Sequence, residues 1–196
     1  MAINNLWKIK KNNVALIIID MQHDFILDGA PIECPGGRDI IPNIKKVKEW
    51  ARQNNIPVFY TKESHRPQKV DFGLELERNE PEHCLEGTNG IEFVDELQPD
   101  EDDFVIIKRR YSGYYLTDLE ILMKGLKKDS LIITGAATNV CVYATALDTQ
   151  QRDMNAIVLS DCVAGTSVDL HEAFLKNIDY VIGDVVTSKE LIDTIK

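Results

Sequence analysis

The chain has 196 residues, of which 44% are hydrophobic, so it is long enough for one α/β domain with a sizeable core and too apolar for a disordered protein. Its formal net charge of −10 argues against nucleic acid or an anionic membrane as a partner. No apolar run approaches the roughly 20 residues that span a bilayer, and the polar stretch Met1–Asn13 does not resemble a secretory signal. We therefore expect a cytoplasmic protein.

Six short apolar runs are predicted to be strands, at Val14–Ile19, Pro57–Tyr60, Phe104–Ile107, Leu131–Thr134, Ala156–Leu159 and Tyr180–Ile182. Stretches with apolar residues three and four apart are predicted to be helices, at Ile40–Gln53, Leu116–Leu126, Asn139–Arg152, Leu170–Asn177 and Lys189–Ile195. Alternating strands and helices, with strands apolar along their whole length, are typical of a parallel sheet covered on both faces. We predict a three-layer α/β/α sandwich with a six-stranded, mainly parallel sheet, formed by residues 1–196 as a single domain.

The stretch Lys62–Asp102 differs from the rest of the chain, since it is rich in charged residues and contains three prolines. A segment of this length without a strand is usually functional in a compact domain. We expect it to cover the site as a lid or to form an oligomer contact.

Three reactive side chains follow or end predicted strands. Asp20 ends the first strand, Lys108 ends the Phe104–Ile107 strand, and Cys141 follows the Leu131–Thr134 strand. Ligands of such sheets bind at the carboxyl ends of the strands, so we expect these three residues to meet at one edge. Taken alone, Asp20 could cap a turn, Lys108 could be a solvated surface lysine, and Cys141 could be a buried thiol. Their convergence at one edge of the sheet favours catalysis instead.

Cys141 is predicted to lie in the first turn of a helix that starts near Thr138. That position favours the thiolate, and its backbone N–H groups can hold a developing oxyanion. Asp20 follows five aliphatic residues, and a carboxylate whose pKa is raised by burial can act as the base. The other cysteines, Cys34, Cys84 and Cys162, show no CxxC spacing and are expected to be buried hydrophobic residues.

Three segments in order resemble the isochorismatase-like cysteine hydrolases. They are Asp20-Met21-Gln22-His23-Asp24-Phe25, Lys108-Arg109-Arg110-Tyr111-Ser112-Gly113-Tyr114 and Gly135-Ala136-Ala137-Thr138-Asn139-Val140-Cys141-Val142. The segment that begins His83-Cys84-Leu85-Glu86-Gly87 is similar to a mid-chain segment of that superfamily, which includes nicotinamidases, N-carbamoylsarcosine amidases, ureidoacrylate amidohydrolases and biuret hydrolases. The resemblance runs over nearly the whole chain.

The resemblance implies a catalytic triad of Asp20, Lys108 and Cys141. It also implies a cis peptide bond between Ala136 and Ala137, and an oxyanion hole made by the N–H groups of Ala137 and Cys141. Because a cysteine nucleophile is present, hydrolysis of a small amide, carbamoyl or ureido C–N bond through a thioester is the better inference than cleavage of a vinyl ether.

The substrate pocket is expected to include Gln22, Phe25, Tyr111 and Ala136. Core or surface packing explains Phe25 and Tyr111 equally well, and Gln22 could instead orient local backbone. No cofactor is required by the triad.

A divalent metal, zinc, manganese or iron, is a further expectation, because nicotinamidases of the superfamily bind one through an Asp-x-His pair and the histidine of the His-Cys segment. The candidates here are Glu63, His65 and His83, with glutamate in place of aspartate.

Alternatives to the cysteine amidohydrolase remain open at this point. One is a metal-dependent nicotinamidase or pyrazinamidase, and another is a scaffold of the same fold with a redox or binding role. A carbamoyl or ureido substrate would favour contacts from Arg109, Arg110 or Asn139. The resemblance also implies a homodimer or homotetramer, with the 62–102 stretch and the Asn139–Arg152 helix as candidate contacts.

Overall fold

The computed structural model describes residues 6–78 and 80–195, and six strands of these residues form one parallel sheet. The strand order is β3-β2-β1-β4-β5-β6, so the chain starts in the centre and builds outward in both directions. The strands are β1 Val14–Ile19, β2 Val58–Glu63, β3 Phe104–Lys108, β4 Ser130–Ala136, β5 Asn155–Ala164 and β6 Asp184–Val186. The predicted parallel sheet is confirmed, and every pairing between neighbouring strands is parallel.

The helices lie close to the predicted positions, with one short helix that the sequence pattern did not indicate, α1 His23–Ile26. The others are α2 Ile41–Gln53, α3 Leu119–Gly125, α4 Tyr143–Gln150, α5 Val168–Asn177 and α6 Ser188–Thr194. A π-helical turn, Thr138–Val142, leads directly into α4, so the expected helix start near Thr138 is confirmed.

The prediction of a strand at Tyr180–Ile182 was wrong. These residues belong to a π-helical segment, Ile178–Ile182, and the sixth strand follows at Asp184. Ile178 and Ile182 are buried whereas Tyr180 and Val181 are exposed, so the apolar residues that pack are four apart, as in a helix. A short apolar run carries too little periodicity to separate the two structures.

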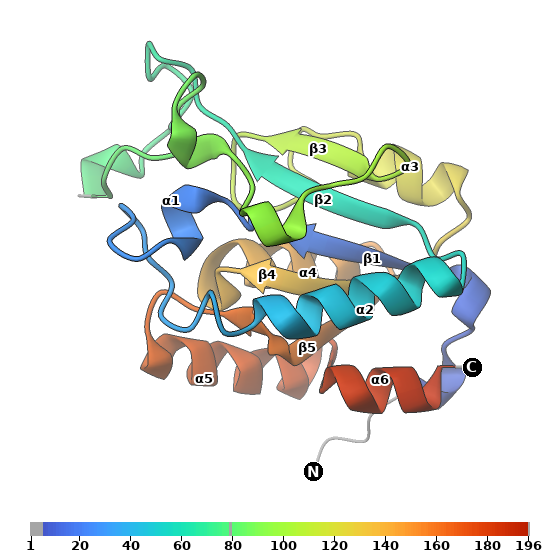
Figure 1. The fold of residues 1–196 in the computed structure, drawn as a ribbon. Coiled ribbons are helices and arrows are strands. Elements are labelled where there is room, and N and C mark those ends of the chain that lie inside the picture. The colour runs from blue at the N-terminus through green and yellow to red at the C-terminus, as the bar shows by residue number, and fades with distance from the viewer. Residues whose placement is uncertain (1–5, 79, 196) are drawn as a thin grey trace.

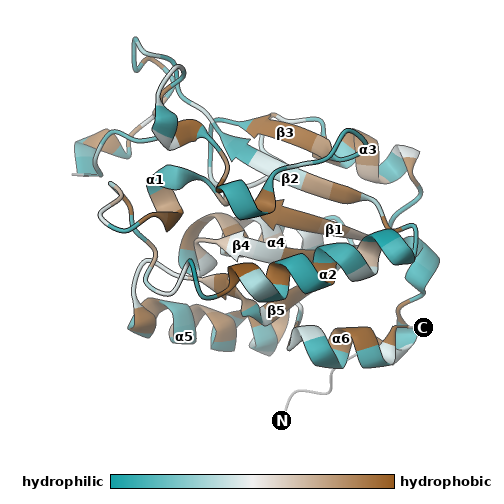
Figure 2. Cartoon of the chain, viewed as in Figure 1, coloured by the Kyte–Doolittle hydropathy of each residue, from teal (hydrophilic) through white to brown (hydrophobic). Residues whose placement is uncertain are grey.

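Helices cover both faces of the sheet, as expected for a three-layer sandwich (Figure 1). α2 and α6 pack on one face, and α3 and α4 pack on the other. Figure 2 shows the central strand β1 as strongly hydrophobic, whereas hydrophilic and hydrophobic patches alternate along α2. None of the helices within the described ranges is long and apolar enough to cross a lipid bilayer.

The central strand β1 supplies both layers of the core. Leu16 and Ile18 point into the layer beneath α2, while Ala15, Ile17 and Ile19 point into the layer beneath α4, since side chains alternate along a strand. Each of the large side chains is fully buried, and each such burial contributes about 1.5–3 kcal/mol. This packing fixes the position at which β1 ends and Asp20 emerges.

Gly135 allows the end of β4 to approach the end of β1. Its φ of +106° lies in a region that favours glycine, and a Cβ atom there would lie 2.1 Å from the carbonyl oxygen of Ile19. The chain can therefore leave β4 and turn into the Cys141 helix directly beside Asp20. The strand order reverses between β1 and β4, which is the place where open parallel sheets bind ligands.

The segment between β2 and β3 contains three short 3₁₀ turns, Leu76–Arg78, Asn89–Ile91 and Asp95–Leu97. Figure 1 shows this green segment extending beyond the arrowheads of β1 and β2. A bridge from Gln22 to Phe93 ties it to the stretch after β1, and a bridge from His65 to Leu85 links two parts of the segment itself. The segment lies at the carboxyl ends of the strands, and its role as a lid over the site or as an oligomer contact stays a prediction.

Candidate active site

A cavity of about 250 Å³ opens at the carboxyl ends of the strands, and Cys141 lines it. Its apolar wall is formed by Phe25, Ile32, Tyr111, Ala136, Ala137 and Val140. Its polar side is formed by Glu63, Glu75, Glu80, His83 and Thr166. The predicted pocket residues Phe25, Tyr111 and Ala136 therefore do line a cavity beside Cys141.

The three predicted catalytic side chains meet beneath this cavity. Nζ of Lys108 lies 2.8 Å from Oδ2 of Asp20 and 3.5 Å from Sγ of Cys141. Oδ1 of Asp20 accepts a hydrogen bond of 2.7 Å from the hydroxyl of Thr61, which also accepts one from the Asp20 N–H. Oδ2 of Asp20 is buried in its ion pair with Lys108 and has no further hydrogen-bond partner among the described residues, so a lone pair is open to a proton from a neighbouring thiol.

Glu63 joins this group from β2, and sequence reasoning had considered it only as a metal ligand. Its Oε2 lies 2.5 Å from Nζ of Lys108 and 3.8 Å from Sγ of Cys141. The register of the sheet explains the contact, because Glu63 pairs with Lys108 across β2 and β3. Lys108 thus lies between two buried carboxylates.

The two carboxylates respond differently to this burial. Burial raises the pKa of Asp20 above its ordinary value, although the charge of Lys108 opposes the shift. Burial also acts to raise the pKa of Glu63, but the charge of Lys108 and hydrogen bonds from His65 and His83 hold it well below the ordinary value. Glu63 is therefore the ionised partner of Lys108, and Asp20 is the group poised to take up a proton.

The thiol of Cys141 is not activated by its helix position alone. Burial, together with the charges of Asp20 and Glu63, raises the pKa of Cys141 well above its ordinary value, and Lys108 only partly offsets this. The expected preference for the thiolate does not hold in this resting arrangement.

The nucleophile turn has the backbone that the resemblance implied. The peptide bond between Ala136 and Ala137 is cis. The carbonyl of Ala137 accepts hydrogen bonds from the N–H groups of Val140 and Val142, which closes the turn around Cys141. The role of the Ala137 and Cys141 N–H groups as an oxyanion hole stays a prediction.

Two histidines and two glutamates form a second cluster beside the cavity, and three of the four, Glu63, Glu75 and His83, line it. Nε2 of His65 and Nε2 of His83 lie 3.2 and 3.3 Å from Oε1 of Glu63. Glu75 adds a carboxylate oxygen 3.8 Å from Nε2 of His65, and the four donor atoms lie within 4.8 Å of one another. Nδ1 of His83 donates to the carbonyl of Pro81, which directs Nε2 inward. Sequence reasoning missed Glu75, because its spacing matches no ligand pattern.

A family model for the isochorismatase domain matches residues 14–190. The chain belongs to the isochorismatase family. It is 35% identical over 167 residues to a probable inactive nicotinamidase of Arabidopsis thaliana, covering 82% of this chain and 85% of that protein. It is 32% identical over 186 residues to enterobactin synthase component B of Escherichia coli, covering 95% of this chain but 65% of that longer protein.

Solved structures support the same membership in the isochorismatase family. An isochorismatase-like hydrolase from Alkaliphilus metalliredigens superposes with a TM-score of 0.85 and 37% identity, covering 92% of this chain and 98% of that one. The pyrazinamidase of Pyrococcus horikoshii in complex with zinc superposes with a TM-score of 0.80 and 31% identity, covering 89% and 99%.

The predicted enzyme class agrees with this family. The N-carbamoylsarcosine amidase of an Arthrobacter species is 29% identical over 186 residues, covering 92% of this chain and 70% of that protein. The expectation of a hydrolase that acts on non-peptide C–N bonds is confirmed at this level, since such amidohydrolases are among the family members similar to this chain.

Gln22 of this isochorismatase-family chain does not line the pocket, which corrects the sequence prediction. It is fully buried, and its Nε2 donates to the carbonyls of Glu63 and Ile91, both at 2.8 Å. Its Oε1 accepts the Glu63 N–H at 2.7 Å. The side-chain amide of Gln22 is therefore fully hydrogen-bonded to backbone groups. Two of these groups belong to Glu63, so Gln22 fixes the position of Glu63 at the end of β2.

The polar residues suggested for a second carbonyl or carboxylate are also occupied elsewhere. Arg109 donates to the carbonyl of Ser64 and pairs with Glu86 at 2.9 Å. Arg110 donates to the carbonyl of Asp71. Asn139 exchanges two hydrogen bonds with Thr166, of 2.9 and 3.0 Å, and so ties the nucleophile turn to the loop after β5.

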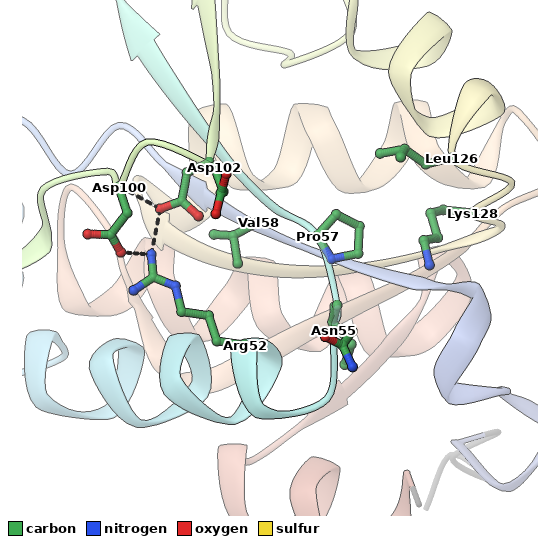
Figure 3. Close-up of a pocket in the computed structure, with 10 residues that line it drawn as sticks. Arg52, Asn55, Pro57, Val58, Asp100, Asp102, Leu126 and Lys128 are labelled. Carbon is green, nitrogen blue, oxygen red and sulfur yellow. Dashed lines mark hydrogen bonds and ion pairs between the residues drawn. The ribbon is translucent and has the colours of Figure 1, made fainter.

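A larger hollow, of about 680 Å³, lies at the opposite ends of the strands (Figure 3). Figure 3 shows Arg52 directed at acidic residues on one side of it, and Lys128 on the other. Arg52 pairs with Asp100 and Asp103. None of the residues that line this larger hollow is a cysteine, histidine or serine. The cavity at Cys141 is therefore the candidate active site, although it is the smaller of the two.

The remaining cysteines, Cys34, Cys84 and Cys162, are buried and free, as expected. Burial raises the pKa of each, to about 12 for Cys34. Cys162 lies within β5, which runs further than the predicted strand.

Proposed function

We propose that this protein hydrolyses a small amide or ureido C–N bond through a thioester on Cys141. One observation carries the proposal: the thiol, the Lys108 ammonium and the Asp20 carboxylate meet at the floor of a cavity large enough for a small molecule. The family resemblance supports the same assignment of roles.

In the first half of the reaction, the Cys141 sulfur attacks the substrate carbonyl while its proton passes to Asp20. A raised pKa suits Asp20 to this role, because a stronger base accepts the proton more readily. The N–H groups of Ala137 and Cys141 hold the oxyanion. Collapse of the tetrahedral intermediate breaks the C–N bond, and Asp20 returns the proton to the departing nitrogen.

In the second half, Asp20 removes a proton from water, and the resulting hydroxide attacks the thioester. The C–S bond breaks, the acid product leaves, and the proton held by Asp20 returns to the sulfur. Lys108 keeps its charge throughout, since Asp20, Cys141 and Glu63 all raise its pKa well above the ordinary value despite its burial. It therefore stabilises negative charge on sulfur at each step.

Ammonia release from nicotinamide, biuret, N-carbamoyl amino acids and ureidoacrylate-like amides tests the proposal. Cys141→Ala should abolish release, and the matched variant Cys34→Ala should retain it, because Cys34 is buried away from the cavity. Normal turnover by Cys141→Ala would sink the mechanism. Silence across the whole panel would instead favour a non-catalytic scaffold of the same fold.

A second candidate is a metal-dependent nicotinamidase or pyrazinamidase, and the cluster of Glu63, His65, Glu75 and His83 favours it. Two imidazole nitrogens and two carboxylates are a donor set that zinc, manganese and iron accept. His65 Nδ1 is buried without a hydrogen bond and lies 3.7 Å from Asp71, in the outer position from which carboxylates orient metal-bound histidines. The residues therefore fit a metal.

When bound there, a divalent ion would supply a Lewis acid in the pocket wall beside the substrate. The chain's own residues would still carry the proton and the acyl group. Glu63 would be shared between this set and Lys108, since its two oxygens face opposite ways.

A further inference from the structure

We infer that the Cys141 cavity accepts an uncharged or positively charged amide and excludes one that carries a carboxylate. This inference rests on the proposed function and names the class of substrate. The first observation is the composition of the cavity, which is lined by three glutamates, one histidine, and no lysine or arginine.

Four basic residues of the site described above, Lys108, His83, Arg109 and Arg110, already have partners. Lys108 is fully buried beneath the floor and contacts both Asp20 and Glu63. His83 donates to the carbonyl of Pro81 and faces Glu63. Arg109 and Arg110 turn toward the segment between Ser64 and Glu86. A second carboxylate on the substrate would find none of these four charged donors free to replace its water.

One neutral donor of the nucleophile turn, Asn139, is occupied as well. The side-chain amide of Asn139 donates to Thr166 and accepts the Thr166 N–H. The side chains of Phe25, Ile32, Ala137 and Val140 add apolar surface to the lining of the cavity. This surface fits a short or flat apolar body attached to the amide.

Acidic groups face the cavity without a matching cation. Glu80 lines the cavity, is exposed, and has no ion pair within the part of the chain that the structure describes. Glu75 lines the cavity beside it, and its nearest basic atom is Nε2 of His65 at 3.8 Å. A metal held by Glu63 and Glu75 would leave Glu80, which lies outside that cluster, unchanged. Like charges placed together exclude a ligand more strongly than missing contacts do.

Three benzamides of one shape test the inference: benzamide, its 4-carboxylate and its 4-aminomethyl derivative. We expect the first and third to be cleaved, or to inhibit cleavage of another amide, at least about 100-fold better than the carboxylate. Equal use of the carboxylate would overturn the inference. Failure to release ammonia from any amide would overturn the proposed function. The inference about charge would then still be tested by alkylation of Cys141, which needs no turnover.

That measurement compares alkylation of Cys141 by neutral iodoacetamide and anionic iodoacetate, followed by mass spectrometry of the Cys141 peptide. The ratio of the two rates is divided by the same ratio in protein unfolded in urea, which cancels the protonation state of the thiol and the intrinsic reactivity of the reagents. We expect the folded protein to favour iodoacetamide by at least about 10-fold beyond the unfolded chain. A ratio equal to that of the unfolded chain would contradict the inference.

Glu80→Lys should reduce this preference several-fold. The control is Glu49→Lys on the exposed side of α2, which changes the net charge equally and should leave the ratio unchanged. Equal effects of the two variants would show that overall charge, and not the cavity, repels the anion, and would overturn the inference.

Discussion

Lys108 Nζ lies 2.5 Å from Oε2 of Glu63, and both side chains are almost completely buried. Because Glu63 is the carboxylate whose pKa is held well below its ordinary value, it is the permanent counter-charge of Lys108. Removing one member of a buried ion pair leaves an uncompensated charge, which costs about 3–5 kcal/mol. We expect Glu63→Gln to lower the free energy of unfolding by about that amount, as measured by urea denaturation at pH 7. An unchanged free energy would show that Asp20 alone compensates Lys108.

The stabilisation by Glu63 should depend on pH in one direction. Its folded pKa is depressed, so the stabilisation is fully present above the unfolded pKa of about 4.5 and is lost as the pH falls toward the folded pKa. The difference in stability between the wild type and Glu63→Gln should be constant from about pH 6 to pH 8 and shrink below about pH 4.5. Urea denaturation at several pH values measures both limbs. A difference that grows on acidification would contradict the assignment.

Asp20→Asn should have the opposite effect on stability. The folded pKa of Asp20 is raised, so its ionised form is disfavoured in the folded state at every pH above that pKa. A neutral amide removes this cost, and Lys108 keeps Glu63 as its partner. We expect unchanged or slightly higher stability, by up to about 1 kcal/mol, with turnover reduced at least about 1,000-fold. Thermal unfolding and ammonia release measure the two effects, and a loss of stability as large as that of Glu63→Gln would refute this contrast.

The acid limb of kcat/KM should report Asp20. Turnover requires Asp20 as a carboxylate, and burial raises its pKa above the ordinary value of 3.8. We expect kcat/KM to fall on acidification with an apparent pKa above that value. Thr61→Val removes the hydrogen bond to Oδ1 that stabilises the carboxylate, so it should move this limb to higher pH. A limb at or below 3.8 would exclude Asp20 as the base.

Metal binding should depend on Glu75 as well as on the histidines. We expect His65→Ala and His83→Ala to abolish stoichiometric zinc binding, and Glu75→Gln to weaken it about 10- to 100-fold. Glu80→Gln is the matched control, since Glu80 lines the same cavity and lies outside the cluster. Isothermal titration and elemental analysis measure the effect. Zinc affinity that is the same in Glu75→Gln and the control would remove Glu75 from the ligand set.

The fold and the identity of the reacting groups follow from local sequence. The run Val14–Ile19 packs on both faces of the sheet, which requires a buried central strand, and Asp20, Lys108 and Cys141 stand where strands end. Because parallel strands present their carboxyl ends at one edge, their convergence could be predicted without knowing the strand order. The family resemblance added the cis bond at Ala136–Ala137, which no propensity indicates.

The partners of each polar atom were decided only by the tertiary structure. Gln22 is fixed by contacts with Glu63 and Ile91, residues that lie 41 and 69 positions away. Glu63 reaches Lys108 because the register of β2 and β3 places them side by side, and Glu75 reaches the histidines because the loop folds back over the sheet. The sequence alone therefore determined which chemistry is available. Long-range packing determined which of the two carboxylates, Glu63 or Asp20, has the lower pKa, and which side-chain amides are already hydrogen-bonded. It also determined the charge of the residues that line the cavity. Each of these properties depends on burial and on neighbours distant in the chain.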